Sequence, residues 1–252
     1  MLVVERRELL LSRLSSDGKV VARDLARELG ISEDSIRRDL RDLAAAGHCT
    51  RVYGGAVPLS RALVDYRSRA DVEPESKRRI ARRAAQLINH GDRVILDGGT
   101  TTLAVARALP ADLQATVITH SPTIAAALID HPTVEILLLG GRIYKHSAVA
   151  CGAATAEAAR AITADLFLLG VTGVHAEHGL TTGDAEEAAM KRTLATQAAD
   201  TYVLASAEKI GAVSPYRVLD LDAVTAIVTD APNTAALDAL HNAAPAIINA
   251  SS

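Results

Sequence analysis

Three stretches with helical periodicity open the chain. Over residues 5–14, 21–29 and 33–46, leucine and isoleucine recur every three or four positions, as on the buried face of a short helix. The third stretch carries Ile36, Leu40 and Leu43 on one such face, and Ser32 before it is a favourable N-cap residue. Gly30 separates the second stretch from the third. The pattern predicts three short helices joined by tight turns.

Polar and β-prone residues follow the third helix and flank Gly54 and Gly55, which predicts a short β-hairpin over 48–58. Residues 58–75 are mixed and polar, with Pro58 and Pro74 near their ends. This composition is typical of a linker, and part of it is expected to be helical. The hairpin and the linker therefore end the first domain, which we place at 1–57.

Beyond the linker, short apolar runs rich in β-branched residues alternate with helical patterns such as 121–130 and 184–199. The alternation predicts an α/β domain over 76–252, with a mainly parallel sheet that helices cover on both faces. The expected strands are 93–97, 115–119, 134–140, 165–171, 201–205 and 225–229.

Composition narrows the class of protein. The chain is 49% hydrophobic but has no Trp and one Phe, so its cores are expected to be aliphatic. Cys49 and Cys151 lie far apart, which argues against a disulfide framework or a structural zinc site and suits a reducing compartment. The N-terminus lacks a long apolar run. We therefore expect no signal peptide, no membrane partner and a cytoplasmic location.

Charge is divided unevenly between the N-terminal third of the chain and the rest. Residues 1–83 hold 18 Lys/Arg against 13 Asp/Glu, whereas residues 84–252 hold 9 against 17. A basic front on an acidic body is expected if the front end meets a polyanion. Solvated arginine-rich helices would give the same asymmetry, so charge alone leaves both interpretations open.

The helices over 21–29 and 33–46 have the spacing of a helix-turn-helix, and the hairpin after them would be its wing. In this motif the second helix enters the DNA major groove, where arginines contact phosphates or guanine edges. A small helical bundle that binds another protein is the alternative. The candidate DNA-binding residues are Ser32, Ser35, Arg37, Arg38, Arg41, Arg51, Tyr53, Gly54 and Gly55.

The run Val94–Leu109 is expected to contain a buried strand, an Asp-Gly-Gly-Thr-Thr-Thr loop and an apolar helix. Unpaired N–H groups and the dipole at a helix N-terminus favour an anion, and glycines let it approach the backbone. Asp97 is expected to point along the strand end, toward sugar hydroxyls or a backbone donor. The sequence thus predicts a phosphate site, with an ordinary β–α turn as the alternative.

Residues 5–57 resemble the winged helix-turn-helix of DeoR-family transcriptional regulators, on the motif Ser-Ile-Arg-Arg-Asp-Leu at 35–40 and the wing Tyr-Gly-Gly-Ala at 53–56. The blocks 76–109, 117–121, 137–152, 168–192 and 203–211 resemble the C-terminal domain of the same family. The resemblance implies a repressor of a sugar-metabolism operon that is controlled by a phosphorylated sugar. It also implies a fold of the ribose-5-phosphate isomerase type and a homo-oligomer, either a dimer or a tetramer, on operator DNA.

Carried onto this chain, the resemblance and the loop pattern give one set of candidate effector-binding residues. Glu187 and Lys191, four residues apart on a predicted helix, could bind sugar hydroxyls or form a surface ion pair. Lys209 would add positive charge beside the phosphate. The full set is Asp97, Gly98, Gly99, Thr100, Thr101, Thr102, Ser121, Gly141, Gly170, Thr172, Glu187, Lys191 and Lys209.

A phosphosugar isomerase or deaminase with an added helical domain is the alternative function. Those isomerases carry carboxylates where this chain has Leu169 and Thr172, so we expect no catalytic residues and no enzyme activity. His175 and His178 have no evident third ligand and are expected to be solvated on a loop. We therefore expect no metal and no cofactor, and Cys151 is expected to be a small buried residue.

Overall fold

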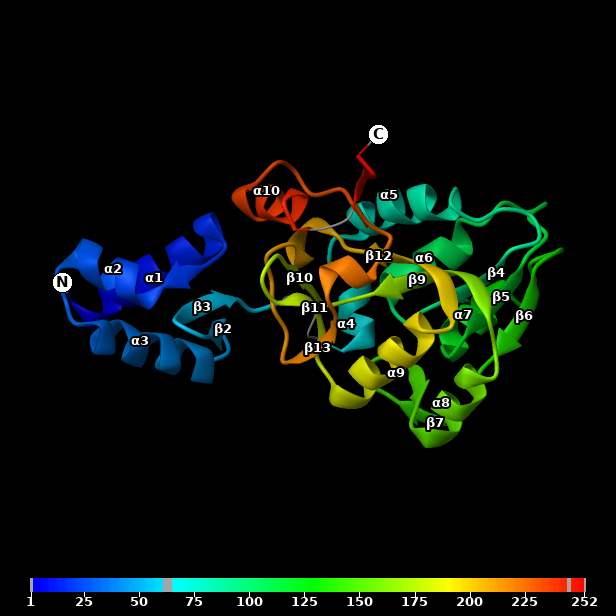
Figure 1. Cartoon of the computed structure of the whole chain (residues 1–252), viewed down its shortest axis with the longest axis horizontal. Coiled ribbons are helices and arrows are strands. Elements are labelled where there is room, and N and C mark those ends of the chain that lie inside the picture. The colour runs from blue at the N-terminus through cyan, green and yellow to red at the C-terminus, as the bar shows by residue number, and fades with distance from the viewer. Residues whose placement is uncertain (1, 61–64, 244–245, 252) are drawn as a thin grey trace.

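The computed structural model describes residues 2–60, 65–243 and 246–251. The head is the N-terminal domain, drawn blue to cyan in Figure 1, and the body is the α/β domain to its right. The head contains helices α1 (Val3–Asp17), α2 (Ala22–Leu29) and α3 (Glu33–Ala45). Strands β1 (Val20–Val21), β2 (Cys49–Val52) and β3 (Gly55–Pro58) complete it as a small antiparallel sheet in the order β1-β3-β2. The predicted winged helix-turn-helix is confirmed.

The helix boundaries follow from local chemistry. Gly30 ends α2 in the left-handed conformation, and the Ser32 side chain caps α3 by accepting a hydrogen bond from the Ser35 N–H. Leu10, Ile36 and Leu40 are completely or almost completely buried in the aliphatic core between the helices. The second helix begins one residue later than predicted, because Val21 pairs with Gly55 as part of β1.

The wing depends on its two glycines for different reasons. Gly54 has φ +78°, a left-handed conformation that other residues adopt at a cost. A Cβ at Gly55 would lie 1.8 Å from the Val20 carbonyl oxygen, so only glycine permits this approach of β1. The wing glycines therefore have structural roles in the head itself.

The predicted linker is more ordered than its composition indicates. Strand β3 reaches Pro58, and Leu59 then pairs with Val213 of the body in an isolated parallel bridge. Helices α4 (Tyr66–Ala70) and α5 (Pro74–Ala85) follow, while the part of the linker at 61–64 lies outside the described residues. Further contacts between head and body join Thr50 to the Val213 carbonyl and Lys19 to Glu177.

The body is built on one seven-stranded sheet whose strands are all parallel, as predicted. Their order is β15-β14-β12-β9-β4-β5-β6. Residues alternate between two cores, since Val94 and Leu96 face one side of the sheet and Ile95 the other. The strands are β4 (Arg93–Leu96), β5 (Thr116–Thr119), β6 (Glu135–Leu138), β9 (Ala164–Gly170), β12 (Ala198–Leu204), β14 (Ala226–Thr229) and β15 (Ile247–Asn249).

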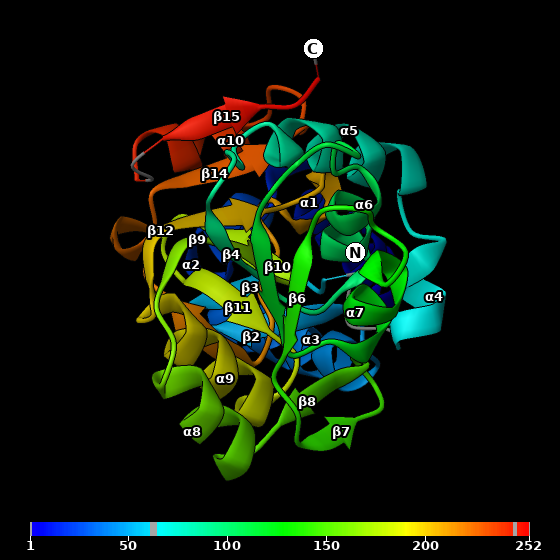
Figure 2. The ribbon, with the colours of Figure 1, turned by 90° about the vertical axis from the view of Figure 1, so that its right-hand side faces the viewer.

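Helices cover both faces of this sheet, which confirms the predicted layering (Figure 2). Helices α5, α6 (Thr100–Arg107) and α7 (Pro122–Leu128) pack on one face. Helices α8 (Ala153–Arg160), α9 (Ala185–Ala195) and α10 (Ala235–His241) supply side chains to the other. The helix predicted over 184–199 ends at Ala195, because Ala198 already pairs with Ala164 in the sheet.

The body also contains short strands outside the main sheet, and the apolar pattern does not predict them. Strands β10 (Gly173–His175), β11 (Gly179–Thr182) and β13 (Tyr216–Leu219) form an antiparallel sheet, and β7 (Arg142–Tyr144) pairs with β8 (Val149–Cys151). They are short and carry many polar residues, so they lack the apolar signal of the main strands. Among the described helices, none has both the length and the apolar character needed to cross a membrane.

Candidate functional site

The loop between β4 and α6 has the predicted strand–loop–helix form. A Cβ at Gly98 would lie 1.9 Å from Val149 Cγ1, and Gly99 has φ +138°, so both positions require glycine. Thr102 Oγ1 donates to the Gly99 carbonyl at 3.0 Å, within the first turn of α6. The Thr100 and Thr101 hydroxyls form no hydrogen bond within the described chain. These two hydroxyls are therefore free to contact a ligand.

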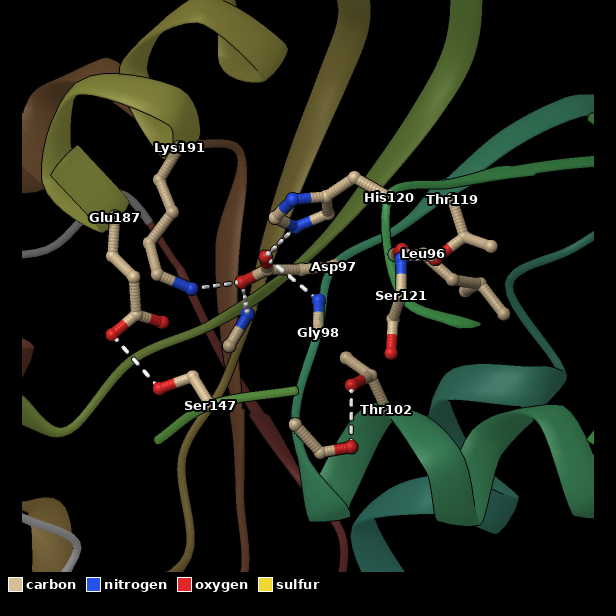
Figure 3. A network of polar contacts seen from close by, with 12 residues as sticks. Leu96, Asp97, Gly98, Thr102, Thr119, His120, Ser121, Ser147, Glu187 and Lys191 are labelled. Carbon is tan, nitrogen blue, oxygen red and sulfur yellow. Dashed lines mark hydrogen bonds and ion pairs between the residues drawn. The ribbon is translucent and has the colours of Figure 1, made fainter. Parts of the chain in front are cut away.

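Asp97, at the start of this loop, is fully buried and lies at the centre of a polar network (Figure 3). Its Oδ1 accepts from Gly98 N at 2.8 Å and contacts His120 Nε2 at 3.0 Å. Its Oδ2 accepts from Gly170 N at 2.9 Å and pairs with Lys191. Burial pushes the pKa of Asp97 up, but Lys191 and His120 outweigh it and hold that pKa below its ordinary value.

His120 lies between two acceptors. Its Nδ1 is 2.8 Å from the Ala150 carbonyl, and its Nε2 faces the Asp97 carboxylate. His120 therefore joins the Asp97 carboxylate to the backbone at Ala150. The three side chains of Asp97, His120 and Lys191 are buried together beneath the loop.

A cavity opens beside the loop. Four cationic residues line it, Arg69, Lys77, Lys191 and Lys209, against the two carboxylates Glu187 and Glu208. The cavity is thus cationic overall. The other lining residues are Val72, Gly98, Gly99, Thr100, Thr101, Thr102, Gly170, Val171, Thr172 and Thr182.

Lys209 is the most exceptional of these cations. It is 6% exposed, and its ammonium group forms no hydrogen bond within the described residues. Burial lowers the pKa of Lys209 from 10.5 to about 8, although neighbouring Glu208 partly opposes that shift. The ammonium group itself reaches the cavity, where an anion can become its partner. Lys209 therefore marks the place in the cavity that is best suited to an anion.

The structure places most of the candidate effector residues around this cavity, but not three of them. Asp97 lies beneath the lining and binds the backbone N–H groups of Gly98 and Gly170, so of its two expected orientations the backbone donor is the one observed. Ser121 caps α7 and its hydroxyl contacts the Ala148 carbonyl. Gly141 packs against Thr155, where a Cβ would lie 2.0 Å from Oγ1.

Sequence reasoning missed three charged residues of the cavity. Arg69 lies in the predicted linker and Lys77 lies just after it. Basic residues in such a segment are typical of solvent-exposed charge, so the sequence did not indicate a binding site there. Lys77 Nζ donates to the carbonyls of Arg69 and Val72, which fixes this segment over the cavity. Glu208 precedes Lys209 in the chain, and that adjacency was the one available signal for it.

The candidate DNA-binding residues lie on one face of the head. Arg37, Arg38 and Arg41 of α3 border a common groove with Arg51 of β2, and Asp34 borders it as well. Tyr53 is fully exposed at the tip of the wing. Arg37 pairs with Glu33 on its own helix, and Ser32 with Ser35. By contrast Asp39, in the same motif, is buried and binds Arg6 of α1, which fixes α3 in the head.

Two further predictions concern reactive side chains. His175 is 8% exposed on β10, so the expectation of a solvated histidine is wrong there. Burial lowers the pKa of His175 to about 4, and its ring is tilted against that of His178, with the ring centroids 4.8 Å apart. Cys151 is buried as predicted, and burial raises its pKa to about 12. In the part of the chain that the structure describes, no cluster of three or more His, Cys, Asp or Glu could hold a metal ion.

Comparisons with solved structures and curated proteins add independent information. A ribose 5-phosphate isomerase A from Methanocaldococcus jannaschii overlaps 54% of each chain, with a TM-score of 0.41 and 16% identity. The HTH-type transcriptional repressor GlcR of Bacillus subtilis is 35% identical over 94% of this chain and 92% of its own. The glycerol-3-phosphate regulon repressor of Escherichia coli is 28% identical over 90% of this chain and 91% of its own.

Family comparisons cover both domains. The DeoR-like helix-turn-helix domain matches residues 6–62, and the DeoR C terminal sensor domain matches residues 72–231. Together these matches span the head, most of the body and every residue of the cationic cavity except Arg69. The chain belongs to the DeoR family of transcriptional regulators.

Proposed function

We propose that this regulator represses a sugar-metabolism operon and that a phosphorylated sugar or related metabolite controls it. The observation that carries the proposal is the cationic cavity, which combines a glycine loop at a helix N-terminus with the buried, unpaired Lys209. The names of relatives support the sugar connection, since one is named the glycerol-3-phosphate regulon repressor and others are named GlcR and FruR.

Within the cavity, the phosphate would lie at the loop. N–H groups at the start of α6 and the hydroxyls of Thr100 and Thr101 would donate to its oxygens, and Lys209 would supply charge. The Glu187 carboxylate, which accepts from Ser147 Oγ at 3.0 Å, would accept hydroxyls of the sugar. This arrangement gives the two ends of the ligand different chemical partners.

The head would bind operator DNA through α3 and the wing, as an oligomer of two or four chains in the cytoplasm. One short recognition helix makes few base contacts, so paired half-sites are needed for specificity. Support comes from the groove that Arg37, Arg38, Arg41 and Arg51 share.

Catalysis is the competing function, because Glu187 and Glu208 place carboxylates in the cavity even though Leu169 and Thr172 are not acidic. We propose that the cavity senses its ligand without converting it, since the relatives are transcriptional regulators. Steady turnover of a sugar phosphate by the purified protein, lost in Glu187→Gln, would contradict this.

The whole proposal is tested by a thermal-shift screen with sugar phosphates, paired with DNA mobility shifts on the promoter region beside its gene. A ligand at 100 times its dissociation constant stabilises the folded state by about 2.7 kcal/mol, which is readily measured. The expected result is stabilisation by phosphorylated but not by free sugars, together with a changed DNA affinity. Equal binding of free sugars would overturn the phosphate assignment.

A further inference from the structure

Two buried side-chain atoms in the described part of the chain lack any hydrogen-bond partner, and both belong to residues that line the same cavity. They are Arg69 Nε and Glu208 Oε2. Buried polar atoms in native proteins are nearly always paired, so each orphan needs an explanation. Because the two meet at one cavity, a ligand that supplies both missing partners is the simplest one.

The rest of each side chain is fixed. Arg69 Nη2 donates to Ser147 Oγ at 3.1 Å and to the His146 carbonyl at 3.3 Å. Glu208 Oε1 accepts from Ser206 Oγ at 2.6 Å. Neither side chain can turn its orphan atom away without breaking these bonds. The two atoms are therefore held ready for a ligand.

The two unpaired atoms require opposite kinds of hydrogen-bond partner. A guanidinium N–H can only donate, so Arg69 needs an acceptor such as a phosphate or ether oxygen. A carboxylate can only accept, so Glu208 needs a donor such as a hydroxyl. A second carboxylate placed against Glu208 would be repelled and would leave that oxygen unpaired.

Resting on the proposed function, we propose that Glu208 and Arg69 set the specificity of the cavity for phosphorylated polyols. Glu208 accepts a hydroxyl at the end of the ligand away from the phosphate, and Arg69 donates to a ligand oxygen. The cavity thereby selects an alcohol over the acid that has the same carbon skeleton.

A purely charge-balancing role for Glu208 is the alternative, because its carboxylate opposes, more than any other group, the lowering of the pKa of Lys77 and Lys209 by burial. The two roles differ in what they predict. Loss of the Glu208 charge alone would also favour the acid, which carries one more negative charge than the alcohol. A variant that keeps the charge but withdraws the carboxylate would weaken binding of the alcohol only if Glu208 is a specific acceptor.

The test measures dissociation constants by calorimetry for two matched pairs of probes. They are sorbitol 6-phosphate with 6-phosphogluconate, and glycerol 3-phosphate with 3-phosphoglycerate. In each pair one terminal CH₂OH is replaced by a carboxylate. We expect the wild-type protein to prefer the alcohol by at least tenfold in the better-fitting pair.

Glu208→Gln should lower that preference at least tenfold, because its amide can donate to the acid. Glu186→Gln is the matched control, since Glu186 pairs with Arg142 on the exposed side of the same region and does not line the cavity. Glu208→Asp keeps the charge but withdraws the acceptor, so it should weaken binding of the alcohol at least fivefold. Arg69→Lys should weaken binding of the alcohol and of the acid equally. Arg67→Lys, on the same helix, should change neither affinity.

An unchanged alcohol-to-acid ratio in folded Glu208→Gln, or a wild-type preference for the acid, would overturn the inference. So would failure of all four probes to bind. The separate sugar-phosphate screen then decides whether the proposed function survives, because other phosphorylated ligands would still bind if only the specificity assignment is wrong.

Discussion

Lys191 of α9 forms a buried ion pair with Asp97, which lies 94 residues earlier at the end of β4 (Figure 3). The pair joins the helix that carries Glu187 to the loop that carries the glycines and threonines. Since Asp97 also accepts from Gly98 and Gly170, one carboxylate fixes the backbone on two sides of the cavity. The pair thus belongs to the support of the cavity, although Lys191 also lines it.

Asp97→Asn should therefore destabilise the fold. Removing one partner of a buried ion pair leaves Lys191 uncompensated, which costs about 3–5 kcal/mol. The lowered pKa of Asp97 means that its contribution is complete above its ordinary value of 3.8 and is lost as the pH falls below that value. Urea unfolding of both proteins at pH 7 and pH 3 measures this. A wild-type advantage that does not shrink at pH 3 would contradict it.

Lys209 should make phosphate binding sensitive to alkaline pH. Its pKa of about 8 is raised when an anion binds, so affinity should fall by up to about tenfold per pH unit above 8. Calorimetric titration with the tightest-binding sugar phosphate at pH 7, 8 and 9 measures the trend. Lys209→Met should bind weakly and lose the trend, while Lys209→Arg should remain charged and also lose it. If the affinity of the wild-type protein stays constant up to pH 9, the phosphate does not bind beside Lys209.

The three threonines of the loop should contribute unequally. Replacing Thr100 and Thr101 by Val removes two free donors, and each hydrogen bond to a charged group is worth about 1.5–3 kcal/mol. Effector affinity should fall at least tenfold, with effector-free operator binding near wild type. Thr102→Val is the control, because its hydroxyl bonds to Gly99 within α6. If the double variant binds the effector as tightly as the Thr102→Val control, the loop is only a β–α turn.

Operator binding should depend on Arg37 and Arg38. Both side chains are exposed on α3, so their joint replacement by Ala removes charge without opening the core. Affinity should fall, and the log–log salt slope should decrease by about one for each DNA phosphate that the head no longer neutralises. Arg78→Ala with Arg83→Ala, two exposed arginines of α5, is the matched control. Equal salt slopes in the two double variants would refute this assignment.

Ser60 should transmit the state of the cavity to the head. It lies two residues after the end of β3, and its hydroxyl donates to the carbonyl of Thr172, which lines the cavity. Loss of this bond in Ser60→Ala should weaken the effect of the effector on operator affinity by up to about fivefold, on the scale of one hydrogen bond. Thr50→Val removes a head–body bond to Val213 that does not reach the cavity, so it should preserve the response. DNA titrations with and without effector compare the two variants.

The sequence by itself determined the parts of this protein that depend on short-range patterns. Apolar spacing located the three head helices and six of the seven strands of the main sheet, all but β15, because periodicities of 3.6 and 2 reflect which face of an element is buried. The run Gly98–Thr102 located the glycine–threonine loop that lines the cavity, since backbone conformation and helix-end chemistry are local. The basic motif around Arg37 and Arg38 placed the recognition helix in the same way.

Only the tertiary structure decided which side chains share a cavity. Arg69, Lys77 and Glu208 come from segments that the sequence treats as linker or loop, and they meet because the sheet order brings distant strand ends together. Asp97 turned inward because Lys191, His120 and two backbone N–H groups surround it, and those partners are remote in sequence or set by loop geometry. Local periodicity encodes burial, whereas the assembly of a charged site depends on long-range packing, which no single segment specifies.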